Sequence, residues 1–99
     1  MRAKARRERI SPAIAFVVKR QRTYQRHSIA ELARRSGLAR GYVTDLENGT
    51  AGDITISTLV GLARGFDVSI LWLLDTILKH AGIGQFAKSR TVLKREVEG

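Results

Sequence analysis

Short helices with clear start and stop signals are the feature that most constrains how this chain can fold. Ser28 to Glu31 reads S-x-x-E, a pattern in which the serine hydroxyl accepts the backbone N–H three residues later and so begins a helix. Gly37 and the pair Asn48-Gly49 mark helix ends, because these residue types adopt the left-handed conformation that closes a helix. Isolated helices of this length are marginal in water, so they must share one core. The pattern therefore predicts a compact all-α domain.

The same signals divide the chain into five predicted helices. Ser11-Pro12 is a typical helix start, because serine caps the helix and proline fits the first turn, where its missing N–H is not needed. Thr55 and Ser69 are expected to cap two later helices, and Gly65 to end the helix between them. The predicted helices cover residues 11–21, 28–36, 39–47, 55–64 and 69–79.

Composition excludes several classes of protein. The 99 residues predict one domain, and the absence of cysteine excludes disulfides, Cys-ligated zinc and a thiol nucleophile. The two histidines, His27 and His80, are far apart in sequence and neither has a partner at metal-ligand spacing. No nucleophile–base set and no phosphate-binding glycine loop is present. We therefore expect no enzyme activity, no metal and no cofactor.

The apolar runs are short. The longest, Ile70 to Leu74, has five residues, whereas a membrane span needs about 20. The basic N-terminus lacks the apolar stretch of a signal peptide. We therefore expect a cytoplasmic protein.

The net charge of +9 is distributed unevenly. Residues 1–27 carry +8, residues 28–78 carry −2, and residues 79–99 carry +3. A near-neutral middle with two basic ends suits a polyanionic partner, and nucleic acid is favoured over a membrane surface because the most apolar helix has no basic face. Residues 1–10 are expected to form a basic arm that follows phosphates or enters a minor groove, although they could instead serve only solubility.

The two helices that flank Gly37 are separated by a turn of about four residues, which is the helix-turn-helix arrangement. These residues also resemble the Cro/cI (Xre-type) helix-turn-helix regulators. The resembling segments are Ser28 to Ala33, Gly37, Tyr42 to Gly49, Ile56 to Leu59, Leu62-Ala63 and Phe66 to Ser69, within residues 11–78. The resemblance implies a five-helix, lambda-repressor-like DNA-binding domain, here residues 11–80, that usually binds as a dimer. Residues 81–99 would then be a C-terminal extension for dimer or partner contact.

The resemblance assigns DNA contacts to particular positions. The recognition helix would be residues 39–47, with Arg40 forking onto a guanine, Thr44 touching a thymine methyl or a phosphate, and Asp45 accepting from a cytosine or excluding wrong sites. Gly41 has no side chain for reading and would permit close approach. The base-contacting positions are Arg40, Gly41, Thr44 and Asp45.

Other positions are expected to contact the DNA backbone. The backbone N–H groups at the start of the second helix point at a phosphate, because the dipole is positive there. Ile29 stands where the family usually has a phosphate-binding glutamine, so that contact is missing or comes from Arg26 or His27. Tyr42 would pack on the sugar-phosphate backbone or be partly buried. The backbone-contacting set is Ser28, Ile29, Tyr42, Asn48, Gly49 and Thr50.

Two further features concern packing within the domain. The resemblance implies that Arg22 and Glu47 form a buried ion pair that ties the first helix to the recognition helix; direct contact of Arg22 with DNA is the alternative. Gln25 replaces an expected apolar residue, so we expect Tyr24 to fill the gap.

Helical spacing predicts which residues of the last two helices face the core. The fourth helix is expected to turn five residues inward: Ile56, Leu59, Val60, Leu62 and Ala63. In the fifth, the core stripe is predicted to be Ile70, Leu73, Leu74 and Ile77. Leu71, Trp72 and Leu78 remain for a different contact, because a helix that is apolar all round should be covered all round. A two-fold dimer would cover them, and folding back of residues 83–97 is the alternative.

The sequence therefore predicts a sequence-specific regulator of transcription, most simply a repressor that occludes a promoter by binding a near-palindromic operator as a homodimer on the nucleoid. The alternative is an antitoxin or protein-docking module with the same fold and mainly non-specific DNA binding, whose cognate protein would use the C-terminal region. The phage, antitoxin, restriction-controller and chromosomal settings all remain open.

Overall fold

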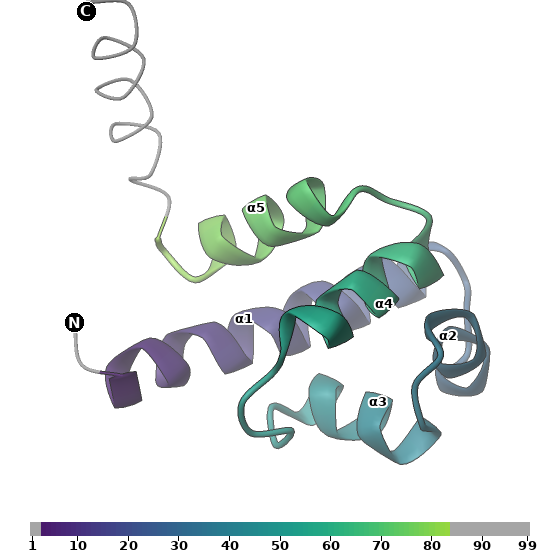
Figure 1. Ribbon diagram of the computed structural model, residues 1–99, viewed down its shortest axis with the longest axis horizontal. Coiled ribbons are helices and arrows are strands. Elements are labelled where there is room, and N and C mark those ends of the chain that lie inside the picture. The colour runs from purple at the N-terminus through teal and green to yellow at the C-terminus, as the bar shows by residue number, and fades with distance from the viewer. Residues whose placement is uncertain (1–2, 84–99) are drawn as a thin grey trace, which may run out of the picture.

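Five helices make up the part of the chain that the computed structural model describes, residues 3–83, with side chains from Arg9 onward. They are α1 (Ala3–Tyr24), α2 (Ile29–Ser36), α3 (Arg40–Asn48), α4 (Ile56–Phe66) and α5 (Ile70–His80). In Figure 1, α1 runs along the length of the molecule, with α5 on one side of it and α3 on the other. α2 packs on both α3 and α4, and α4 packs on α5. This is the all-α architecture expected from the sequence.

One core joins all five helices. Its largest fully buried side chains come from every element: Val17 and Val18, Leu32, Val43 and Leu46, Leu62 and Phe66, and Leu73. The predicted caps of three helices are confirmed, since the hydroxyls of Ser28, Thr55 and Ser69 accept the backbone N–H three residues later at 3.0, 3.2 and 2.9 Å. Local sequence signals thus set the starts of α2, α4 and α5.

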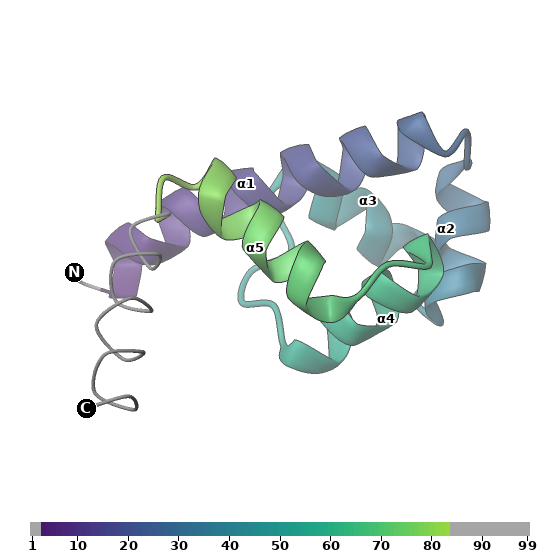
Figure 2. The same cartoon turned by 90° about the horizontal axis from the view of Figure 1, so that it is seen from above.

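The predicted start of the first helix at Ser11-Pro12 is wrong, because α1 begins at Ala3 and holds Pro12 inside it. Alanine, lysine, arginine and glutamate dominate residues 3–9, and they are strong helix formers. The N-terminal part of α1 is also anchored to the residues that follow α5. The Arg9 guanidinium donates to the carbonyls of Ala81, at 2.9 and 3.2 Å, and Gly82, at 2.9 Å. Figure 2 shows the end of α5 lying over this part of α1.

The sequence predicted that Gly65 ends the fourth helix, and this prediction is wrong. α4 continues to Phe66, and Asp67 takes the left-handed conformation with φ 58°. A Cβ on Gly65 would lie 2.2 Å from Oγ and 3.2 Å from Cβ of Ser36, and a Cβ on Gly61 would lie 2.7 Å from the Ser36 carbonyl oxygen. The two glycines are therefore needed for close approach of α4 to α2 rather than for chain reversal.

Two other residues of α4 were predicted wrongly. Ile56 and Val60 do not face the core, because they are 64% and 39% exposed. The helix packs through Leu59, Leu62 and Ala63 instead, which lie on the side that meets α2 and α5. An eleven-residue helix that is covered on one side only leaves its opposite apolar residues in water.

Gly61→Ala is expected to destabilise the domain by about 1–3 kcal/mol, because the added Cβ meets a backbone oxygen that no rotamer change can move. Gly41→Ala is the matched control. It also lies in a helix, its Cβ would have no neighbour within 4 Å, and alanine should stabilise α3 by about 0.5–1 kcal/mol. Urea unfolding of the two variants measures both changes. Destabilisation by both, or by neither, would contradict this account of the α2–α4 contact.

Candidate nucleic-acid interface

α2 and α3 are joined by a tight turn. Gly37 ends α2 with φ 68°, and the N–H of Leu38 reaches back to the Ala33 carbonyl at 2.9 Å. Leu38 is half-buried against the core, and Ala39 then begins α3 without a side-chain cap. The first N–H groups of α3 consequently have no side-chain acceptor on Ala39. The turn thus fixes the orientation of α3 relative to α2.

α3 has one buried and one exposed side. Val43 and Leu46 are fully buried, and the four positions assigned to base contact all lie on the exposed side: Arg40, Gly41, Thr44 and Asp45. Within residues 3–83, the Arg40 side chain makes no hydrogen bond or ion pair, so its guanidinium fork is open to a ligand. The Thr44 hydroxyl donates to the Arg40 carbonyl at 3.1 Å, so this hydroxyl is already bonded within the helix.

Arg22 and Glu47 form the ion pair that holds α3 against α1. The Arg22 Nε donates to Glu47 Oε2 at 2.6 Å and a terminal nitrogen donates to Oε1 at 2.9 Å. The two side chains are only 16% and 6% exposed. The hydrogen bond to Glu47 raises the pKa of Arg22, so its charge is permanent. Arg22 also donates to the His27 carbonyl at 2.9 Å, which ties the pair to the start of α2.

The residues assigned to phosphate contact differ in how many of their hydrogen-bonding groups are already used within the domain. Thr50 uses its N–H, at 2.9 Å, on the Asp45 carbonyl, and Gly49, with φ 75°, donates to the Leu46 carbonyl. Both N–H groups therefore close α3, whereas the exposed side chain of Asn48, the last residue of α3, forms no hydrogen bond with the described residues. Tyr42 is half-buried, and its hydroxyl lies 3.4 Å from Thr58 Oγ1, so it also holds α3 to α4.

At the start of α2, Ser28 caps the helix and is itself exposed. Its hydroxyl accepts the N–H of Glu31, which leaves the N–H groups of Ile29 and Ala30 directed out of the helix end. The Ile29 side chain packs on the core. A hydrogen bond from Arg34 lowers the pKa of Glu31, so this carboxylate stays charged at the helix start.

The segment before α2 differs from the expectation. Tyr24 does not fill the gap, because it is 81% exposed. Gln25 turns inward instead and donates to the Phe66 carbonyl at 2.8 Å, which satisfies the end of α4. Arg26 takes the left-handed conformation with φ 61°, and the N–H groups of Arg26 and His27 close α1. A polar residue thus replaces the expected apolar contact by capping a neighbouring helix.

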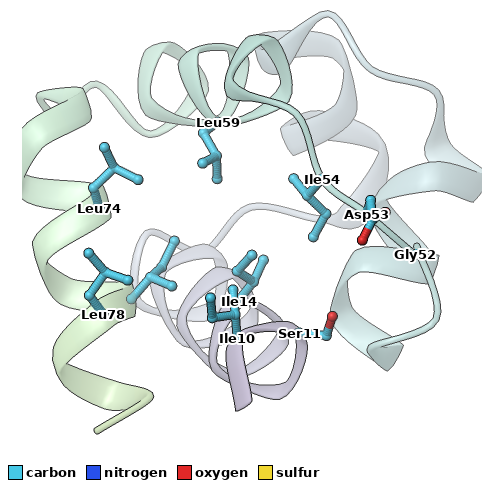
Figure 3. Close-up of a pocket in the computed structure, with 10 residues that line it drawn as sticks. Ile10, Ser11, Ile14, Gly52, Asp53, Ile54, Leu59, Leu74 and Leu78 are labelled. Carbon is cyan, nitrogen blue, oxygen red and sulfur yellow. The ribbon is translucent and has the colours of Figure 1, made fainter. Parts of the chain in front are cut away.

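The fifth helix presents apolar surface on more than one side. Leu73 and Ile77 are buried, whereas Leu71 is 75% and Trp72 43% exposed. Leu78 is half-buried and lines an apolar cleft of about 480 Å³ between α1, the loop before α4, and α5 (Figure 3). Its other aliphatic lining residues are Ile10, Ile14, Ile54, Leu59, Leu74 and Ile77.

Sequence reasoning missed the contacts that fasten α5 to α1. Besides the Arg9 anchor, the Phe16 and His80 rings stack with centroids 4.2 Å apart, and the Arg20 guanidinium lies 5.1 Å from the Phe16 centroid. The spacing of Phe16 and Arg20 on one helix face was the only available signal, because the partner residue His80 lies far along the chain.

In residues 3–83, no single helix is long and apolar enough to cross a membrane. α4 and α5 taken together are long and apolar enough, but the two helices are bent by 109° relative to each other.

Comparisons with known proteins agree with this geometry. The family model HTH_3, described as helix-turn-helix, matches residues 18–73. The wild-type restriction-modification controller protein C.Esp1396I is similar in structure, with a TM-score of 0.64, 25% identity, and coverage of 72% of this chain and 90% of that one. An arginine-to-alanine mutant of the controller in a trigonal crystal form gives the same score and identity, with 72% and 93% coverage. No curated protein matches the sequence.

Proposed function

The chain belongs to the HTH_3 helix-turn-helix family of DNA-binding regulators, and we propose that it is a transcriptional repressor that binds a near-palindromic operator as a homodimer. The observation that carries the proposal is the exposed side of α3. A rigidly held helix presents an arginine fork, a methyl group and a carboxylate together, and the Arg40 fork has no partner within the described residues. Such groups read base edges in the major groove.

In the proposed complex, α3 lies in the major groove and its N-terminal residues face the bases. Arg40 donates two hydrogen bonds to guanine O6 and N7, Thr44 contacts a thymine methyl, and Asp45 accepts from a cytosine amino group. Gly41 has no neighbour within 4 Å of its missing Cβ, so it lets the helix backbone approach the DNA. The open N–H groups at the start of α2 and the Asn48 side chain bind the flanking phosphates.

The dimer is proposed to form through α5. Leu71 and Trp72 are large apolar side chains in water, and the cleft lined by Leu74 and Leu78 adds an unfilled aliphatic surface on the same helix. Apolar surface of this kind marks an interaction site. A two-fold pair would present two α3 helices about 34 Å apart, which matches one turn of DNA. Promoter occlusion then requires no chemistry, and the protein acts on the nucleoid in the cytoplasm.

Leu71→Glu is expected to convert the dimer to a monomer, because it places a charge in the proposed apolar interface while Leu71 makes little contact within its own chain. Sedimentation velocity at micromolar protein measures the change. Ile56→Glu is the matched control, since Ile56 is also exposed, at 64%, but lies on α4 outside the cleft. If Leu71→Glu sediments as the wild type does, α5 is not the dimer interface.

Selection of fragments from a genomic DNA library tests the function as a whole. We expect the purified protein to enrich one two-fold-symmetric motif, at both low and moderate salt. Motif-free binding that falls steeply with salt would instead show that the basic residues bind phosphates alone. The protein would then be a docking module with mainly non-specific DNA binding. The similarity to a restriction-modification controller favours a motif that lies beside restriction and modification genes.

A further inference from the structure

A second groove lies between α2 and α4. It has a volume of about 500 Å³ and runs along the C-terminal half of α2, the turn after it and the exposed side of α4. None of the residues assigned to DNA contact lines it. Its lining includes three arginines and two aliphatic side chains: Arg34, Arg35, Arg64, Leu38 and Val60.

Arg35 and Arg64 both bring guanidinium nitrogens without a partner in residues 3–83 to this groove. Arg35 donates its Nε to the Gly65 carbonyl at 2.8 Å, and this bond orients the guanidinium while its two terminal nitrogens form no hydrogen bond with the described residues. Arg64 is exposed, and its side chain forms no hydrogen bond or ion pair within residues 3–83. The close approach of α4 to α2 that Gly61 and Gly65 permit brings these two arginines to the same groove.

The groove also has an apolar part. Val60 is 39% exposed on the uncovered side of α4, and Leu38 is half-buried in the same lining. Arg34 adds a further positive charge to the lining, although its exposed guanidinium forms an ion pair with the Glu31 carboxylate at 2.7 Å. A phosphate chain would use the arginines but would gain nothing from the two aliphatic side chains. A peptide that carries both carboxylates and an apolar side chain would use the arginines and the two aliphatic side chains together.

We infer that this groove binds a short acidic segment of a partner protein, with its carboxylates on Arg35 and Arg64 and one aliphatic or aromatic side chain on Leu38 and Val60. Arginine forks bind carboxylates with two parallel hydrogen bonds, and a preoriented fork loses little entropy on binding. The inference does not rest on the operator-binding proposal, because the groove and the exposed side of α3 share no assigned residue.

Panning a random-peptide phage library on the purified full chain tests this inference, and the peptide that is most enriched then becomes the probe. We expect enriched peptides to place Asp or Glu next to Leu, Ile or Phe. Fluorescence anisotropy should show about tenfold weaker binding of the synthetic peptide to Arg64→Gln, the loss expected for one charged hydrogen bond. Arg35→Lys should weaken it similarly, because an ammonium keeps the charge but lacks the fork.

Lys19→Gln is the control, since it removes an exposed cation of α1 that lies outside the groove. It should leave peptide affinity unchanged. Three results would overturn the inference: no enrichment above that on the Arg35→Gln/Arg64→Gln double variant, equal peptide affinity for wild type and Arg64→Gln, or loss of binding to a random-sequence DNA duplex in Arg64→Gln beyond that in Lys19→Gln. The last would assign the groove to DNA phosphate. Arg64→Gln should fold normally, because its side chain has no partner in residues 3–83.

Discussion

Glu47→Ala is expected to destabilise the domain by about 3 kcal/mol, because it breaks a buried ion pair. The change removes the acceptor of both hydrogen bonds that Arg22 donates to Glu47, and it leaves a guanidinium that is only 16% exposed without its counter-charge. Water cannot fully replace the lost carboxylate at that depth. For a domain of this size the midpoint of thermal unfolding should fall by about 12 °C or more. Differential scanning calorimetry measures it.

Two controls separate burial from charge. Arg34→Ala breaks an ion pair of similar length, 2.7 Å, whose side chains are 69% and 37% exposed, so it should change the stability only slightly. The double variant Arg22→Met/Glu47→Leu removes both charges and should recover much of the stability lost in Glu47→Ala. If Glu47→Ala and Arg34→Ala have equal effects, the pair between α1 and α3 does not hold the recognition helix.

Arg40→Ala is expected to weaken binding to the selected operator by more than about tenfold, because each half-site loses a bidentate contact that contributes about 1–3 kcal/mol of discrimination. Stability should not change, since the Arg40 side chain has no partner within residues 3–83. The loss should be confined to operators that carry the contacted guanine. On duplexes in which that base pair is replaced, wild type and Arg40→Ala should bind alike. Anisotropy titrations on matched duplexes measure this coupling.

Lys19→Gln provides the control for loss of one positive charge away from α3. It should reduce affinity slightly and equally on every sequence, as a purely electrostatic contribution does. A uniform loss of the same kind for Arg40→Ala would show that this arginine contacts phosphate and reads no base.

Much of the fold could be predicted because its signals are local. Ser28, Thr55 and Ser69 each cap a helix through a residue three positions away, and Gly37 and Gly49 close helices through their own backbone conformation. The division of α3 into a buried and an exposed side likewise follows from helical periodicity.

The features that could not be predicted depend on contacts distant in sequence. Pro12 is usual at a helix start, and its place inside α1 follows from helix-forming residues before it and from the contact between Arg9 and Ala81. Gly65 has the residue type of a helix end, but its neighbour Ser36 is what requires glycine there. Gln25 satisfies a carbonyl of α4 that no local pattern brings near it.

The candidate site divides in the same way. The base-contacting positions of α3 were named from the resemblance to the Cro/cI family, and all of them lie on the exposed side of the helix. The groove between α2 and α4 could not, because Arg35 and Arg64 lie on different helices and come together only through the α2–α4 packing. The sequence also did not show that Thr50, in the loop after α3, donates both its N–H and its hydroxyl to the Asp45 carbonyl.

Methylation interference on the selected operator tests most directly whether α3 reads bases in the major groove. Dimethyl sulfate places a methyl group on guanine N7 in the major groove and on adenine N3 in the minor groove. We predict that guanine methylation at symmetric positions about one helical turn apart abolishes binding of the wild-type protein, and that Arg40→Ala loses sensitivity at one of them in each half-site. Interference by adenine methylation alone, or by no base at all, would contradict recognition through α3.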